Sequence, residues 1–160
     1  MLALKRLLLV LVLLAAGAAA GVAAHTALTP GDTMFAGKRP ANLGYESGRL
    51  APCKRTPNCV SSQADPADAE HYIAPLAFRG DFRKVEQAVA AMPGATIVKR
   101  DGNYLYAEYR TPLMRFVDDV ELLHDAAAGI VHVRSASRLG RRDFGVNRKR
   151  IEALRTLLQR

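Results

Sequence analysis

The sequence predicts an α+β domain built on a mostly antiparallel, curved sheet with helices packed on one face. Strand-like and helix-like segments follow one another in the order β-α-β-β-β-β-α. The four consecutive strands fall into two hairpins, and the strands of a hairpin pair antiparallel. Each helical segment has a single apolar stripe, which must be buried against the sheet. A sheet covered on one face can leave its other face to water or curve it around a ligand.

The first strand and the first helix of this domain come early in its sequence. Residues 71–78 (HYIAPLAF) have a strand-like composition, although Pro75 lacks an N–H and places the strand at an edge or a bulge. Asp81 is a suitable N-cap for the helix that follows. The apolar face of that helix repeats at helical spacing through Phe82, Val85, Val89 and Met92. Pro93 and Gly94 end the helix.

Two hairpins are predicted next. Residues 95–100 and 103–110 flank Asp101-Gly102, which is a strong signal for a tight hairpin turn. Residues 115–124 and 129–137 flank a turn of small residues and form the second hairpin. These four strands account for most of the predicted sheet.

The last predicted helix covers residues 148–159 and begins after Asn147, a suitable N-cap. Its apolar residues Ile151, Leu154 and Leu158 form one stripe. No internal repeat and no second domain are visible in the sequence. Residues 52–160 are therefore predicted to form a single domain.

The N-terminal residues 1–24 have the pattern of a targeting segment. Basic residues precede an apolar run, and small residues follow up to a Val22-x-Ala24 cleavage pattern. The uncharged stretch 7–24 is also just long enough to span a bilayer, so an uncleaved anchor is the alternative. In both cases we expect the rest of the chain to be exported, either free in the periplasm or held there by an inner-membrane anchor. Residues 25–51, rich in Gly, Pro and small polar residues, are predicted to form a linker or an extended arm.

The two cysteines, Cys53 and Cys59, lie in a segment with neighbouring prolines that favour a turn. In an oxidising compartment we expect them to form a disulfide. A zinc site would need two further ligands, and the histidines stand at no recognisable spacing. A redox or nucleophilic cysteine would need a lowered thiolate pKa, for which Lys54 and Arg55 offer weak support. We therefore predict a structural disulfide, no metal and no cofactor.

Basic residues are concentrated in residues 131–150 (VHVRSASRLGRRDFGVNRKR), which contain seven Lys or Arg and one acid, Asp143. The whole chain has 23 Lys and Arg against 15 Asp and Glu. Such a localised charge indicates either an anion-facing surface or a buried ion-pair lattice. Within it, Arg148, Lys149 and Arg150 are interpreted as a solvated helix face. Export, the absence of Trp and the low aromatic content argue against nucleic acid as a partner.

Asp118 and Asp119 lie inside a predicted strand, where alternation points them towards opposite faces of the sheet. One face carries Phe116, Asp118, Val120 and Leu122, and the other carries Val117, Asp119, Glu121 and Leu123. A buried carboxylate needs a partner, and Arg134 on the neighbouring strand can supply one. This pattern favours a structural lattice of Asp and Arg. The functional alternative is a catalytic carboxylate, Asp119 acting with Glu121 or with Glu108 across the sheet.

Polar side chains also follow one another towards the end of the next strand. His132 and Arg134 share one face of this strand, and Ser135 lies on the other. Ser135, Ser137 and Arg138 provide hydroxyl and guanidinium groups that suit a phosphate or a carboxylate. The same groups satisfy loop backbone atoms in ordinary proteins, so the structural alternative stays open. The turn before the last helix offers backbone N–H groups either to an anion or simply to helix capping.

Four blocks of this sequence carry a family resemblance. They are PNCVSSQA at 57–64, IAPLAF at 73–78, RFVDDVEL at 115–122 and HVRSASRLGRRDFGVNRKRIE at 132–152. In this order they resemble the family known as domain of unknown function 1499, over roughly residues 52–160. The resemblance implies a small exported or membrane-associated protein with a shared polar site of unassigned chemistry. The residues that match by position are Asn58, Ser61, Ser62, Asp118, Asp119, Arg134, Ser135, Ser137, Arg138, Asp143, Asn147 and Arg148.

Three function hypotheses follow. The first is a non-enzymatic binding domain of the cell envelope that holds an anionic or amphipathic small ligand, or a lipid headgroup, in the concavity of the sheet. Its ligand-binding residues would be Asp118, Asp119, Arg134, Ser135, Ser137, Arg138 and Asn147. The second is a hydrolase or transferase with Asp119 as general base and His132 or Ser135 assisting. The third is a structural or assembly partner of other envelope proteins. Membrane association is expected if the N-terminal segment stays uncleaved.

Overall fold

The computed structural model describes residues 35–159. The predicted targeting segment, residues 1–24, and the first part of the predicted arm, residues 25–34, lie outside the described residues. The described chain contains, in sequence order, β1 (Tyr45–Glu46), β2 (Arg49–Leu50), β3 (Cys59–Ser61), β4 (Leu76–Ala77), α2 (Arg83–Ala90), β5 (Ala95–Asp101), β6 (Tyr104–Arg110), β7 (Val117–Asp125), β8 (Ile130–Ser137) and α3 (Val146–Leu158).

The main sheet has the strand order β3-β8-β7-β6-β5, and β4 also pairs with β8. Every one of these pairings is antiparallel, and both predicted hairpins, β5–β6 and β7–β8, are present. Asp101 pairs with Tyr104, so Gly102 occupies the tight turn with a φ of 59°, a conformation that glycine adopts without steric cost. The predicted α+β class with a mostly antiparallel, curved sheet is confirmed.

The strand predicted over residues 71–78 is largely wrong. Only β4, Leu76–Ala77, pairs there, and Tyr72 forms an isolated bridge to Ser61. Pro75 explains the short strand, because a proline cannot donate a backbone hydrogen bond to its neighbour. The sequence patterns also gave no signal for β3, whose three residues pair with the far end of β8.

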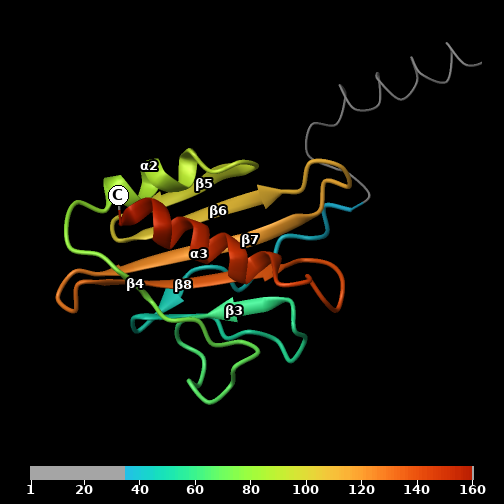
Figure 1. The fold of residues 1–160 in the computed structure, drawn as a ribbon, viewed down its shortest axis with the longest axis horizontal. Coiled ribbons are helices and arrows are strands. Elements are labelled where there is room, and N and C mark those ends of the chain that lie inside the picture. Colours follow the sequence, from blue (N-terminus) through green and yellow to red (C-terminus); the bar gives the residue numbers. More distant parts are fainter. Residues whose placement is uncertain (1–34, 160) are drawn as a thin grey trace, which may run out of the picture. The chain divides into compact units, whose positions relative to one another are not determined.

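Both helices pack on one face of the sheet, as predicted, and α3 crosses in front of the strands in Figure 1. Asp81 accepts the backbone N–H of Arg83 through its side chain, but α2 begins one residue later than the predicted cap implies, with Phe82 at the N-cap. At α3 the N-cap is Gly145, and the carboxylate of Asp143 accepts the N–H groups of Gly145 and Asn147. The predicted capping role of Asn147 is therefore wrong, because Asp143 performs it.

The core between helices and sheet is apolar and continuous. Alternate residues of the central strands face the helices, and the apolar stripes of α2 and α3 cover them. The buried members are Val60, Ile73, Leu76, Phe82, Val85, Val89, Met92, Leu105, Ala107, Tyr109, Val120, Leu122, Val131, Val133, Ile151 and Leu154. Within residues 35–159, no helix is long and apolar enough to cross a membrane.

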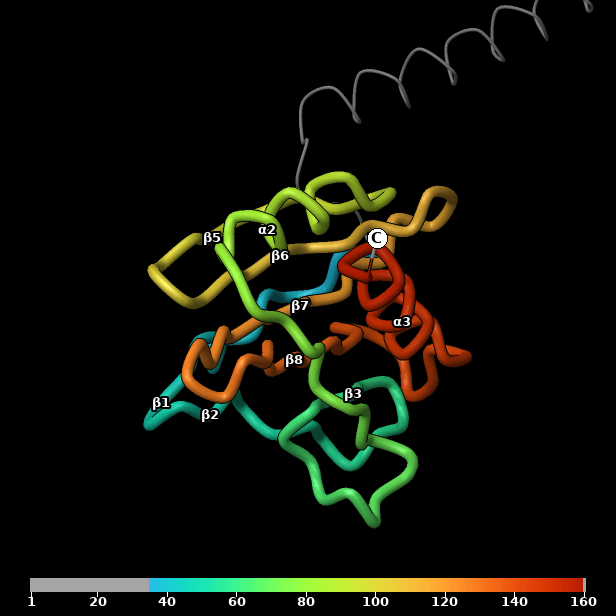
Figure 2. Tube along the Cα trace, turned by 60° about the vertical axis from the view of Figure 1, so that its left-hand side comes forward, coloured from blue at the N-terminus to red at the C-terminus, as the bar shows by residue number. Residues whose placement is uncertain are grey.

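The opposite face of the sheet is covered by the chain before β3. Residues 35–50, which we call the arm, pass behind the sheet in Figure 1 and end in the small β1–β2 hairpin, which Figure 2 shows from the side. Leu50 is buried against Tyr104, Tyr106 and Leu123, so a second, small apolar cluster closes one end of this face. Towards the other end the layer under the arm is polar.

Strand β5 forms one edge of the main sheet. Its register with β6 shifts between Ile97 and Lys99, which is a β-bulge. Lys99, Arg100 and Asp101 follow the bulge and are exposed. The edge is therefore both irregular and charged.

Candidate functional site

The polar layer beneath the arm contains four charged side chains and one phenol that are joined by hydrogen bonds. Arg138, at the end of β8, donates to Asp119 on β7 through Nε at 3.0 Å and to Glu108 on β6 through Nη2 at 2.6 Å. The hydroxyl of Tyr106 donates to Asp119 Oδ1 at 2.6 Å. Arg39 of the arm closes the group by pairing with Glu108 Oε1 at 2.6 Å. We call these five residues the ionic cluster.

The surroundings of the ionic cluster keep Glu108 charged and Tyr106 neutral. Burial alone would raise the pKa of Glu108, but hydrogen bonds from Arg138 and Arg39 outweigh it and lower the pKa to about 2. Burial, together with the hydrogen bond to Asp119, raises the pKa of Tyr106 well above its usual value. The phenol is therefore available as a hydrogen-bond donor, and the Glu108 carboxylate as an acceptor, over the whole physiological range.

Glu121 and Arg134 form a second buried pair beside the ionic cluster. Arg134 Nη1 donates to Glu121 Oε2 at 2.8 Å, and both side chains are almost fully buried. Tyr104 and the backbone N–H of Gly44 donate to the other oxygen of Glu121. The predicted partner of Arg134, Asp118 or Asp119, is therefore wrong. Glu121 lies directly opposite Arg134 in the register of β7 and β8, which makes it the nearest carboxylate.

A cavity of about 380 Å³ opens between the arm, the disulfide loop and the end of β8. Its lining is Lys38, Arg39, Pro40, Ala41, Asn42, Lys54, Asn58, Cys59, Asp119, Arg134, Ala136, Ser137 and Arg138. Five of these residues are cationic and one, Asp119, is anionic. Arg134 Nε is buried and has no hydrogen-bond partner within the described chain. We call this cavity the basic pocket.

The helix-covered face holds a separate polar group. Asp118 pairs with Arg150 of α3 at 2.6 Å, and the guanidinium of Arg150 also stacks over the Tyr109 ring. The side chain of Arg150 is thus largely buried, at 9 % exposed, and its interpretation as part of a solvated helix face is wrong. The helix turns this residue inwards because it lies one residue before Ile151 of the apolar stripe, at the border of the buried face.

Asn147 fills the space between α3 and the strand end. Its amide donates to the hydroxyl of Ser137 and to the backbone carbonyl of Asn58, and its carbonyl accepts from Ser135 and Arg150. This network engages the hydroxyls of both Ser135 and Ser137 within the protein. It ties α3 to β8 and to the segment before β3.

The sheet therefore divides the predicted ligand-binding residues into two groups. Asp119, Arg134 and Arg138 line the basic pocket under the arm. Asp118, Ser135 and Asn147 lie on the helix-covered face, and Ser137 contacts Asn147 there while also lining the pocket rim. Alternation along the strands predicts this division, because neighbouring residues point to opposite faces.

The residues of the predicted catalytic set are not brought together. His132 Nδ1 lies 3.3 Å from the hydroxyl of Ser62 on the neighbouring segment. Asp119 is engaged by Arg138 and Tyr106, and Ser135 faces the helices. No hydrogen bond among the described residues joins Asp119 to His132 or Ser135.

The family model for proteins of unknown function, DUF1499, matches residues 49–158 of this chain. The chain belongs to the DUF1499 family. The resemblance drawn from the four sequence blocks is confirmed. No curated protein and no solved structure is similar enough to count as a match. The DUF1499 match begins at Arg49, so the arm side of the basic pocket, with Lys38 and Arg39, lies outside it.

The predicted disulfide of this DUF1499 domain is confirmed. Cys53 and Cys59 are bonded, with their Cα atoms 5.7 Å apart. Cys59 begins β3 and lines the basic pocket, and Lys54 within the closed loop lines it as well. The crosslink therefore holds a cationic side chain at the pocket wall. No group of three or more potential metal-ligating side chains occurs within residues 35–159.

Several residues of the basic pocket and the ionic cluster were not predicted from the sequence. Arg39 and Lys38 belong to the arm, whose composition gave no signal for packing against the sheet. Tyr106 was detectable in principle, since alternation along YLYAEYR places it with Glu108 on the face opposite Leu105 and Ala107. Glu108 was predicted only as a possible catalytic partner of Asp119. A strand whose second face carries Tyr, Tyr and Glu is unusual for a solvated surface, and that pattern was the available clue.

Proposed function

We propose that this DUF1499 domain is an exported, envelope-located binding domain that takes a small anionic ligand, bearing a carboxylate or phosphate group, in the basic pocket. The observation that carries the proposal is the excess of positive charge at this pocket, which is lined by five cationic side chains and one carboxylate. Guanidinium and ammonium groups gathered around one cavity suit a carboxylate or phosphate group.

Charge within the pocket favours an anion. Arg39 and Arg138 are engaged by Glu108 and Asp119, but Lys38 and Lys54 form no ion pair within the described residues. Both lysines are exposed at the pocket wall, one from the arm and one from the disulfide loop. Charge-assisted hydrogen bonds from ammonium and guanidinium groups are the strong ones in anion recognition.

The size and the rigidity of the pocket suit a small molecule. Its volume of about 380 Å³ lies at the lower end of the range for ligand sites. The ionic cluster fixes the position of Arg138, and Glu121 fixes that of Arg134, so the two guanidinium groups are held before a ligand arrives. Donors held in place lose little conformational freedom on binding.

Export is supported by two features. The N-terminal sequence has the pattern of a targeting segment, and the disulfide is of the kind that persists in oxidising compartments. Residues 1–24 then either leave the chain or hold it at the inner membrane facing the periplasm. Neither outcome changes the basic pocket, which is formed by residues 38–138.

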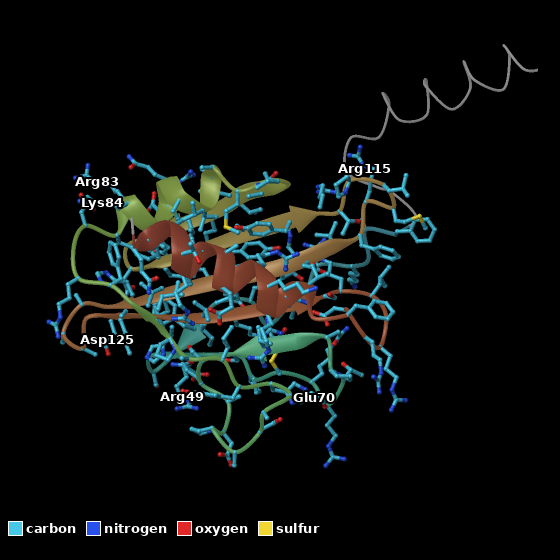
Figure 3. All side chains as sticks on the ribbon, in the orientation of Figure 1. Arg49, Glu70, Arg83, Lys84, Arg115 and Asp125 are labelled. Atoms are coloured by element: carbon cyan, nitrogen blue, oxygen red, sulfur yellow. A yellow bond between two sulfur atoms is a disulfide. The ribbon has the colours of Figure 1, made fainter. Side chains whose placement is uncertain are left out.

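The test begins with the full chain isolated from its own cells in mild detergent and examined by native mass spectrometry for a bound molecule. Titration calorimetry with inorganic phosphate and with citrate then measures anion binding directly. We expect Lys38→Gln with Lys54→Gln to weaken binding at least about tenfold, since each charge-assisted hydrogen bond contributes about 1.5–3 kcal/mol. The matched control is Lys84→Gln, an exposed lysine on α2 that Figure 3 labels at the edge of the domain, away from the pocket.

The outcomes separate the possible sources of the anion. Binding of free phosphate or citrate that weakens with salt supports a soluble ligand, and binding of phosphatidylglycerol vesicles alone, lost in the double lysine variant, supports a lipid headgroup. The proposal fails if no bound molecule is found and the double variant and the control behave alike. Salt-sensitive co-purification of other envelope proteins, with no small ligand, would instead favour the assembly-partner hypothesis.

A further inference from the structure

One end of the domain exposes large apolar side chains at the tips of two loops. Leu113, between β6 and β7, and Phe144, between β8 and α3, are each 89 % exposed. Met114, Leu139 and Val146 lie in or beside the same loops and are also exposed. Scattered apolar residues are normal on protein surfaces, but a group of this size gathered at one end indicates an interaction site. We call these five residues the apolar tips.

The two loops belong to the same end of the sheet. The last pair of β6 and β7 is Arg110 with Val117, and the backbone N–H of Arg138 donates to the carbonyl of Val117 at 3.2 Å. Both loops therefore leave the sheet at this point, as Figure 1 shows at the end where β6 and β8 finish. Pro112 of one loop and Val146 of the other line one shallow hollow.

The backbone of both loops is held in an uncommon conformation. Phe144 has a φ of 55°, and so has Arg115. A bulky residue at positive φ costs free energy, and such outliers concentrate at functional positions. The exposed Phe144 ring makes no compensating aromatic contact within residues 35–159.

The charges around the apolar tips are of one sign. Arg115, Arg141 and Arg142 are exposed in the same two loops. Asp143, the acid in these loops, is turned towards the backbone N–H groups of Gly145 and Asn147 at the start of α3. Apolar side chains ringed by arginines match an anionic bilayer surface, where apolar groups enter the acyl boundary and basic groups meet the headgroups.

The chain also reaches this end from the predicted targeting segment. The ring of Phe35, the first described residue, lies 5.2 Å from the ring of Phe116 in the β6–β7 loop. Ten residues separate Phe35 from the uncharged stretch 7–24. A chain of that length spans at most roughly 35 Å when fully extended. The point at which a tether from residues 7–24 would join the domain therefore lies at the same end as the apolar tips.

We propose that the apolar tips dock on an anionic membrane surface, with Leu113 and Phe144 inserted at the boundary between headgroups and acyl chains. The basic pocket is not part of this contact, so the docking goes beyond the proposed ligand binding and can fail independently of it. A docked domain would hold the pocket at a fixed height above the bilayer, because Arg138 of the pocket immediately precedes Leu139 of the apolar tips.

The chain contains no Trp, so a single introduced Trp is the only source of Trp fluorescence. Full-length Phe144→Trp and Leu113→Trp variants are reconstituted separately into phosphatidylglycerol vesicles whose acyl chains carry bromine, a contact quencher of Trp emission. The matched control is Tyr45→Trp. Tyr45 is exposed and bonds Asn103 in the β5–β6 turn, which lies at the other end of the sheet.

We expect emission from positions 113 and 144 to shift to the blue and lose most of its intensity, and emission from position 45 to do neither. Adding Arg141→Gln and Arg142→Gln to the Phe144→Trp variant should remove most of the quenching, as should phosphatidylcholine in place of phosphatidylglycerol. Equal quenching at all three positions, or none at 113 and 144, overturns the proposal. A blue shift that grows with protein concentration and needs no lipid would assign the surface to a second copy of the chain and also overturn it.

Discussion

Replacing Arg138 by methionine tests whether the ionic cluster is a buried structural unit. In the structure this guanidinium is 6 % exposed and bonds both Asp119 and Glu108. Arg39 bonds the same Glu108 but is 53 % exposed. The two arginines share a carboxylate and differ in burial, so Arg39→Met is a matched control for Arg138→Met.

The expected costs follow from this difference in burial. Removing one partner of a buried ion pair leaves an uncompensated charge and costs about 3–5 kcal/mol of unfolding free energy. Glu108 keeps Arg39 and Arg110, and Asp119 keeps Tyr106, so we expect Arg138→Met to cost about 3 kcal/mol. An exposed pair contributes at most about 1 kcal/mol, which is the expected cost of Arg39→Met.

The pH dependence provides an independent check. The native pKa of Glu108, about 2, lies below its ordinary value of 4.5. Its contribution to stability is therefore complete above about pH 4.5 and is lost as the pH falls towards 2. Without Arg138, burial favours the protonated acid, so the deficit of Arg138→Met should shrink over the same interval.

Urea unfolding of the full chain in mild detergent, followed by far-ultraviolet circular dichroism, measures both effects. Neutralising the whole group with Arg138→Met, Glu108→Gln and Asp119→Asn should restore part of the stability, because no buried charge is then left unpaired. The interpretation is refuted if Arg138→Met costs no more than Arg39→Met. A deficit that does not change between pH 5 and pH 3 would contradict the assignment to buried carboxylates.

Three further predictions concern single structural features and are checked by the same unfolding measurement. Arg150→Met should cost about 3 kcal/mol, because its buried carboxylate partner loses its cation, and a cost below about 1 kcal/mol would show that this pair is hydrated. Gly94→Ala should cost about 3 kcal/mol, since the φ of Gly94 is 76° and the added methyl group would lie 2.5 Å from the backbone oxygen of Arg110. Gly102→Ala is its control and should cost only about 1 kcal/mol, because Gly102 has a φ of 59° but open space around it. Replacing Cys53 and Cys59 together by alanine should cost about 2 kcal/mol for so short a closed loop, and an unchanged midpoint would mean that the loop is ordered without the bond.

Much of the fold was predictable because its signals are local. The β5–β6 hairpin depends on Gly102 in a tight turn, and the apolar stripe of α3 repeats within a single helix. Strand β3 was missed because it has three residues and exists only through pairing with β8, which follows some seventy residues later. Pairing across such a distance leaves no periodic trace in the sequence.

For the candidate site, the sequence predicted on which face of the sheet the residues lie, but it did not predict their ion-pair partners. Alternation correctly placed Asp118 and Asp119 on opposite faces, because it depends only on strand geometry. It could not assign Arg134 to Glu121, since that contact depends on the register between β7 and β8. The arm was beyond prediction for another reason: the apolar and polar contacts that hold it come from the sheet, and its own composition resembles that of a linker.

The bulged and charged edge of β5 has a consequence for contacts between two copies of the domain. A long, regular edge strand presents unpaired backbone groups on which a second sheet can add. The bulge after Ile97 breaks that row, and charged side chains, Lys99, Arg100 and Asp101, stand exposed beyond it. The β5 edge therefore offers a second copy of the domain no regular row of backbone groups on which to extend the sheet, and this protection resides in one irregular strand.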